Sequence, residues 1–186
     1  MEMFKIADLE FEIENAVLDG FISEEDGGIG WGIEIQAKER DVEDGRWRPK
    51  ASAEILMYTG HGELENWGDL SGRQISWNEP LDTDGEPRAL LCVFEHQPIY
   101  ESCVRIEVGP KGALALDWAA KSDVLWKAPY TRGLDLRVQT ELEFVGIWCG
   151  KMPEEACTKA LSMYLTDADF AFRTVRAGTS LMVPNT

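Results

Sequence analysis

The sequence predicts a mostly-β fold: a single antiparallel β-sandwich or flattened barrel of about eight to ten strands, with one short docked helix. Apolar and polar residues alternate with a period of two along several segments, turn-forming pairs separate these segments, and helical spacing occurs once. The 186 residues suit one domain, 1–186, that ends with the helix and a final strand.

The alternating segments are the predicted strands. The first is Leu9 to Ile13, in which every second residue is a glutamate. Near Gly146 the apolar phase changes, which predicts a bulge that switches faces. Less regular strands are expected at residues 53–58, 73–77, 89–95 and 169–175. The other alternations are Ile29–Ala37, Tyr100–Val108, Leu114–Trp118 and Leu134–Phe144, of which the last is the longest.

Turn residues fall between these segments. Asp26-Gly27, Asp44-Gly45 and Asp84-Gly85 suit tight hairpin turns, whose central residues need positive φ. Gly109 to Gly112 forms a further turn. Short turns between strands predict antiparallel neighbours.

One helix is predicted at about residues 153–165. Pro153 suits the first helical position, and Glu154 and Glu155 suit the positive end of the helix dipole. An apolar stripe follows at helical spacing, so the helix should dock on the sheet. The stripe is Cys157, Ala160, Leu161, Tyr164 and Leu165.

Charge is the most informative feature for function. The chain has 34 acidic and 18 basic residues, a net charge of −16, which disfavours nucleic acid and anionic membranes as partners. Residues 1–93 carry 22 acidic and 8 basic side chains, so the N-terminal half holds most of the excess. We therefore expect an acidic patch there, either a solvated face or a docking surface for a basic partner. Its expected residues are Glu24, Glu25, Asp26, Asp41, Glu43, Asp44, Trp47, Glu63, Glu65, Trp67 and Asp69.

Catalytic and metal chemistry have little support. Of the two histidines, His61 and His96, His96 could share a strand face with Cys92, but at ~13 Å along one strand. That separation is too long for direct proton transfer. Asp82 to Glu86 resembles the start of a calcium loop, but a turn explains it better. No catalytic residue, metal ligand or cofactor is therefore predicted.

The four cysteines form no C-x-x-C pair. With no secretory signal or apolar membrane span, the chain is expected to be cytoplasmic, with free thiols. In a secreted protein, Cys92 and Cys103 on neighbouring predicted strands would be the pair to watch.

Three hypotheses about function follow. The first is a non-enzymatic binding protein of the immunity or antitoxin type, whose acidic surface docks a basic protein such as a toxin. The second is a small-ligand or carbohydrate-binding domain that uses tryptophans near loops, and it requires them to be exposed. The third is an enzyme of unrecognised type. The four tryptophans near loops are Trp47, Trp67, Trp77 and Trp126.

Overall fold

A computed structural model describes residues 2–23, 28–42, 45–59, 64–125, 128–165, 170–175 and 178–185. The chain divides into two compact units. The first comprises Met1–Val17, Ile33–Glu54 and Ser71–Glu143, and the second comprises Leu18–Gly32, Ile55–Leu70 and Phe144–Thr186. Four strands have residues in both units.

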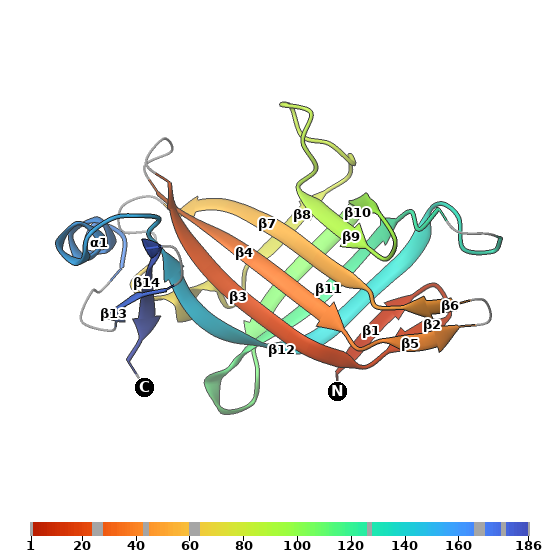
Figure 1. Ribbon diagram of the computed structural model, residues 1–186, viewed down its shortest axis with the longest axis horizontal. Helices are drawn as coiled ribbons and strands as arrows, with labels where there is room; N and C mark the ends of the chain where they lie inside the picture. Colours follow the sequence, from red (N-terminus) through yellow and green to blue (C-terminus); the bar gives the residue numbers. More distant parts are fainter. Residues whose placement is uncertain are drawn as a thin grey trace. The chain divides into compact units, whose positions relative to one another are not determined.

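The first unit contains all or part of each of the seven strands of a closed ring (Figure 1). The order is β11-β10-β9-β7-β4-β3-β12, and β12 pairs with β11 to close it. The described pairings around β9, β10 and β11 are antiparallel, as expected. The bounds are β3 Ile13–Ser23, β4 Gly28–Ala37, β7 Lys50–Thr59, β9 Ala89–Cys92, β10 His96–Val108, β11 Leu114–Ser122 and β12 Leu134–Trp148.

Shorter strands add to this ring. Strand β1 (Met3–Ile6) pairs with β12 and with β2 (Leu9–Phe11), and β8 (Gln74–Trp77) pairs with β10. Strands β5 (Arg40–Val42) and β6 (Gly45–Trp47) form a separate hairpin. The turn predicted at Gly109 is the 3-10 helix η2 (Pro110–Gly112) between β10 and β11.

The alternation in sequence becomes alternation in burial. Along β11 every second residue from Leu114 to Ser122 is buried, and β4 buries Ile33, Ile35 and Ala37. Two buried indole N–H groups of this core have hydrogen-bond partners, which offset the cost of their burial. The indole N–H of Trp118 donates to Ser102 Oγ over 2.9 Å, and that of Trp77 donates to the Ile99 carbonyl, also over 2.9 Å.

The second unit holds the ends of β3, β4, β7 and β12 with four further elements. Strand β14 pairs with β12 and with β13. The aromatic ring of Phe144 lies within 4.7 Å of Trp67, 6.1 Å of Trp31 and 6.2 Å of Phe170, measured between centroids. The further elements are η1 Trp67–Leu70, α1 Glu154–Leu161, β13 Phe170–Thr174 and β14 Ser180–Pro184.

Gly146 is the point where β12 changes face. Its φ of 130° is one that side chains with a Cβ rarely adopt, and a Cβ there would lie 2.4 Å from the Met182 carbonyl oxygen. Before it Leu142 is buried, and after it Ile147 and Cys149 are buried. The predicted change of phase at this glycine is confirmed.

Helix α1 begins one residue later than predicted, because Pro153 is its N-cap and not its first helical residue, and it ends four residues early, at Leu161 rather than residue 165. The hydroxyl of Ser162 donates to the Lys159 carbonyl over 2.9 Å, which competes with continued helical bonding. The chain then turns, with the amides of Tyr164 and Leu165 both donating to the Leu161 carbonyl.

The predicted mostly-β class with one helix is confirmed. Of the two architectures expected, the closed strand order corresponds to a barrel with additional strands rather than to a sandwich. Within the described ranges, no helix is long and apolar enough to cross a membrane.

Candidate functional site

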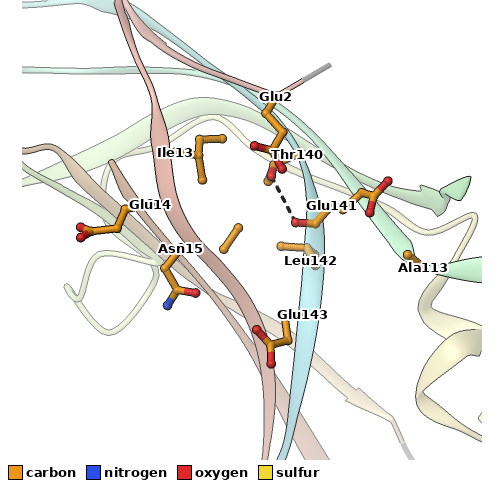
Figure 2. Close-up of a pocket in the computed structure, with 10 residues that line it drawn as sticks. Glu2, Ile13, Glu14, Asn15, Ala113, Thr140, Glu141, Leu142 and Glu143 are labelled. Carbon is orange, nitrogen blue, oxygen red and sulfur yellow. Dashed lines mark hydrogen bonds between the residues drawn. The ribbon is translucent and has the colours of Figure 1, made fainter. Parts of the chain in front are cut away.

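An acidic hollow lies on the first unit, between the start of β3 and the middle of β12 (Figure 2). Its volume is about 320 Å³. Figure 2 shows Glu14 on β3 and Glu141 and Glu143 on β12, with Glu2 beside Thr140. Carboxylates are therefore its dominant polar groups.

A second hollow of about 340 Å³ shares Glu2, Thr140 and Glu141 with the first and adds Glu107 and Asp117. The two together are called the acidic groove below. It carries six carboxylates, contributed by the N-terminal segment, β3, β10, β11 and β12. They are Glu2, Glu14, Glu107, Asp117, Glu141 and Glu143.

The alternation of β12 places these side chains. Thr140 and Leu142 are 5% exposed and belong to the floor, whereas Glu141 and Glu143 between and beyond them are exposed. Glu107 lies on an exposed position near the end of β10. A strand that buries every second residue necessarily presents the others to solvent.

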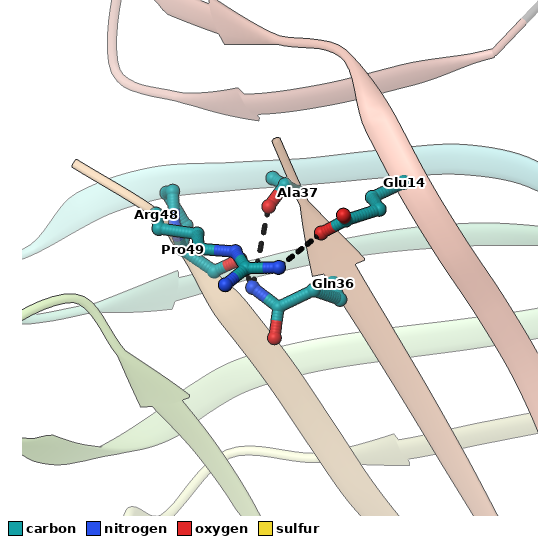
Figure 3. A network of polar contacts seen from close by, with 5 residues as sticks. All are labelled: Glu14, Gln36, Ala37, Arg48 and Pro49. Carbon is teal, nitrogen blue, oxygen red and sulfur yellow. Dashed lines mark hydrogen bonds and ion pairs between the residues drawn. The ribbon is translucent and has the colours of Figure 1, made fainter. Parts of the chain in front are cut away.

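Two groove carboxylates are neutralised by arginines. Arg48 donates to Glu14 over 2.6 Å, and Arg137 lies 2.5 Å from Asp117. Figure 3 shows the Arg48–Glu14 pair together with Gln36, which donates to the carbonyls of Ala37 and Pro49, each over 3.2 Å. The Glu14 carboxylate raises the pKa of Arg48, so the arginine is held in its charged form.

The other four groove carboxylates have no basic partner within ion-pair distance among the described residues. They are Glu2, Glu107, Glu141 and Glu143. All four are exposed, so water solvates them in the free protein. A cationic surface that replaces this water would find negative charge that the chain itself leaves uncompensated.

Five acidic residues of the first unit outside the groove have basic partners. Glu12 pairs with Lys38, Glu34 with Lys50 over 2.6 Å, and Glu10 with Lys5 over 3.9 Å. Arg46 pairs with both Glu39 and Asp41, each over 3.0 Å. Glu10, Glu12, Glu34, Glu39 and Asp41 are called the paired acidic set below.

Six residues of the predicted acidic patch lie outside the described residues: Glu24, Glu25, Asp26, Glu43, Asp44 and Glu63. Asp41 belongs to the paired acidic set. Asp69 accepts the amides of Glu65 and Asn66 over 2.7 and 3.0 Å, so it closes the turn that leads into η1. Glu65 and Asp69 remain exposed, but in the second unit.

The tryptophan expectations need correction. Trp47 is 0% exposed, so it cannot belong to a docking surface. It packs edge-on against Phe94 and Tyr130, with centroids at 5.5 and 5.3 Å, and stacks with Phe11. Trp47 ends the β5–β6 hairpin, and the apolar area of an indole favours burial wherever the core can receive it.

Trp77 is 8% exposed and lines a hollow of about 440 Å³ with Leu81 and Arg88. Trp67 is half-buried against Phe144, and Trp126 lies outside the described residues. The carbohydrate hypothesis requires exposed indole faces. The burial of Trp47 and Trp77 removes two of its four candidates.

Cys92 and His96 are closer than the sequence suggests. Residues 93–95 turn, and Cys92 is directly opposite His96 on the antiparallel neighbours β9 and β10. The expected separation of ~13 Å along one strand is therefore wrong, because it assumed a continuous strand. His96 is exposed and Cys92 is half-buried, so they form an open surface pair. His61 lies outside the described residues.

The Asp82 segment is a turn, as expected. Asp82 Oδ1 accepts the amides of Asp84 and Glu86 over 2.9 and 3.1 Å. Across the described ranges, no group of three or more His, Cys, Asp or Glu side chains is arranged to hold a metal ion.

The groove was not predicted from the sequence, because only the net charge of the two halves of the sequence was compared. The groove residues missed in this way are Glu2, Glu107, Glu141 and Glu143. The alternation of β12 and β10 already marked Glu107, Glu141 and Glu143 as outward-facing. What the sequence does not show is that the N-terminal segment and β3 lie beside them.

Comparison with protein-family models, curated proteins and solved structures gave no significant match. Function must therefore be inferred from the residues of the chain itself.

Proposed function

We propose that this protein is a non-enzymatic binding protein that docks a basic protein, and that it acts as an inhibitor of the immunity or antitoxin type. The acidic groove supports the proposal most strongly. Four of its carboxylates have no basic partner in the part of the chain that the structure describes, and they form a local excess of negative charge beside buried strand residues.

Such a surface suits a Lys- or Arg-rich partner. Complementary charge raises the rate of encounter by orders of magnitude and disfavours acidic competitors. Because the groove side chains are exposed, salt screens the attraction, and binding should weaken as ionic strength rises.

Two variants with equal charge change test the proposal. The groove variant is E2Q/E107Q/E141Q/E143Q. The control variant, E10Q/E12Q/E34Q/E39Q, removes the same charge from the paired acidic set. Each replacement keeps the size of the side chain.

The first measurement is binding of a short oligoarginine peptide to the wild type and both variants at low and high salt. We expect the groove variant to bind at least about tenfold more weakly and the control variant to bind nearly as the wild type does. Equal weakening in both variants would show that only net charge matters and would reject the groove.

The second measurement addresses inhibition. A basic protein isolated through the wild type should be lost with the groove variant and retained with the control variant, and its activity should fall stoichiometrically when the wild type is added. Retention by the groove variant, or undiminished activity in the complex, would contradict the proposal.

A further inference from the structure

The second unit contains a pair of buried cysteines. Cys149 is 2% exposed and Cys157 is 0% exposed, and both are free thiols. Cys149 follows the end of β12, and Cys157 lies in the first half of α1.

The pair expected in an oxidising compartment was different. Cys92 and Cys103 do lie on the neighbouring strands β9 and β10. Cys92, however, is opposite His96, whereas Cys103 is opposite Ala119 and Ser76, about 20 Å further along β10. A disulfide needs Cα atoms within about 7 Å, so these two cannot be linked.

The backbone of Met152 is hydrogen-bonded to both Cys149 and Cys157. Its amide donates to the Cys149 carbonyl over 3.1 Å, and its carbonyl accepts the Cys157 thiol over 3.5 Å. The chain between them turns at Gly150, whose φ is 58°. One backbone residue is therefore hydrogen-bonded to both cysteines.

Ser180 of β14 fixes this turn from the other side. Its carbonyl accepts the Cys149 amide over 2.9 Å, and its hydroxyl donates to the Met152 carbonyl over 2.6 Å. The two cysteines are thus held by β12, β14 and the start of α1.

The two thiols also affect each other electrostatically. Burial, followed by the neighbouring Cys157 thiol, raises the pKa of Cys149 from 9.0 to about 12. At neutral pH this thiol is protonated, so its reaction in the closed structure is slow.

We propose that Cys149 and Cys157 are an oxidation site that forms an intramolecular disulfide by exchange with a low-molecular-weight disulfide such as oxidised glutathione. The inference is independent of the basic partner. The disulfide joins the end of β12 to α1 and fixes the helix on its sheet.

The reaction has two exchange steps. One cysteine loses its proton and attacks a sulfur of oxidised glutathione, whose S–S bond breaks while a new one forms; the released glutathione takes up a proton. The second cysteine then attacks the protein sulfur of this mixed disulfide and releases the second glutathione. The protein loses two electrons and two protons, and oxidised glutathione is reduced to two thiols.

Because both sulfurs are buried, exchange requires α1 to open locally, or takes place before the helix has docked. The experiment therefore compares two routes. Reduced protein is refolded in a glutathione redox buffer at about pH 8, and folded protein is incubated in the same buffer. Free thiols are then alkylated and the unreduced protein is digested with trypsin.

Lys151 lies between the two cysteines, so a disulfide joins two separate tryptic peptides. We expect this linked pair to dominate after refolding, and to form more slowly in folded protein. In folded protein its rate should rise with pH. The linked form should melt about 5–10 °C above the reduced form.

Variants keep the result unambiguous. C92S/C103S leaves the buried pair in place and should form the same link, whereas C149S and C157S should form none. The proposal is overturned if refolded native protein retains Cys149 and Cys157 as alkylated thiols or glutathione adducts. A linked form that melts below the reduced form would overturn it as well. If a buried Ser variant fails to fold, C92S/C103S still decides the question.

Discussion

The first unit presents two acidic regions that differ in how their charge is compensated. In the paired acidic set, each carboxylate has a lysine or arginine on a neighbouring segment, as Glu34 has Lys50 at 2.6 Å. In the acidic groove, Arg48 and Arg137 neutralise Glu14 and Asp117 and leave the other four carboxylates without a basic partner among the described residues.

The difference shows that a surplus of acidic residues in a sequence does not locate a negative surface. The N-terminal half supplies most of the acidic surplus. Its lysines and arginines, however, lie beside its acidic residues in the folded chain, as Lys38 lies beside Glu12 and Arg46 beside Glu39. Cross-strand pairs of opposite charge stabilise a sheet modestly. Because their charges largely cancel, they attract a charged binding partner only weakly. The groove draws most of its uncompensated charge from β10 and β12.

The largest expected effect is a loss of stability on replacing Trp47, which tests whether this residue belongs to the core or to an acidic surface. If Trp47 belongs to the core of the first unit, Trp47→Ala should lower the free energy of unfolding by about 3–5 kcal/mol. The cause is loss of a 0% exposed indole and its contacts with Phe11, Phe94 and Tyr130. Urea unfolding followed by tryptophan fluorescence and circular dichroism measures the change.

Trp47→Phe is the matched control. The indole N–H of Trp47 is buried and has no hydrogen-bond partner among the described residues, so phenylalanine removes an unpaired donor and keeps an aromatic ring. It should cost much less than alanine. If Trp47→Ala lowers the free energy of unfolding by less than about 1 kcal/mol, Trp47 is not part of the core.

The next effect tests the comparison of charge directly. The groove variant and the control variant remove the same number of negative charges, so general repulsion falls equally in both. The control variant also breaks ion pairs with Lys5, Lys38, Lys50 and Arg46. At low salt we expect it to melt about 2–6 °C below the groove variant.

Salt supplies the check on this difference. Surface pairs are screened at about 10 Å in 0.1 M salt and more strongly above it, so the gap between the two melting temperatures should narrow as salt is added. A gap of opposite sign, or one that salt leaves unchanged, would mean that the two regions do not differ in local compensation.

Much of the fold could be predicted from the sequence because burial follows a strict period of two. The alternations at Ile29–Ala37 and Leu114–Trp118 became β4 and β11, and Gly146 marked the change of face in β12. The end of α1 was missed because Ser162, a polar residue beside an apolar stripe, bonds back to Lys159. Closure of the ring was left open because strand order is a long-range property.

The candidate site was harder to predict because it depends on pairing between distant segments. Glu14 and Arg48 are far apart in sequence, yet the guanidinium donates to the carboxylate over 2.6 Å. Cys149 and Cys157 are connected through hydrogen bonds of Met152 and Ser180, which lie far apart in sequence. Residue types and local periodicity do not show which distant segments lie side by side. That depends on which strands pair and in which register.

The smallest expected effect is a titration within the paired acidic set. A hydrogen bond to Glu12, followed by the charge of that carboxylate, raises the pKa of Lys38 above its ordinary value of 10.5. The folded state therefore holds this proton more tightly than the unfolded chain does. Any stability from the pair is complete below pH 10.5 and is lost as pH rises through the higher folded value.

Carbon NMR of the lysine side chains measures this shift directly. The Lys38 signal should titrate above pH 10.5 in the wild type, and Glu12→Gln should move its midpoint downward. Glu143→Gln in the groove should leave it unchanged, because Glu143 is not among the groups that raise the pKa of Lys38. A Lys38 midpoint that is insensitive to Glu12→Gln would show that the ion pair is not formed in solution. The Glu12 carboxylate would then be as uncompensated as the unpaired carboxylates of the groove.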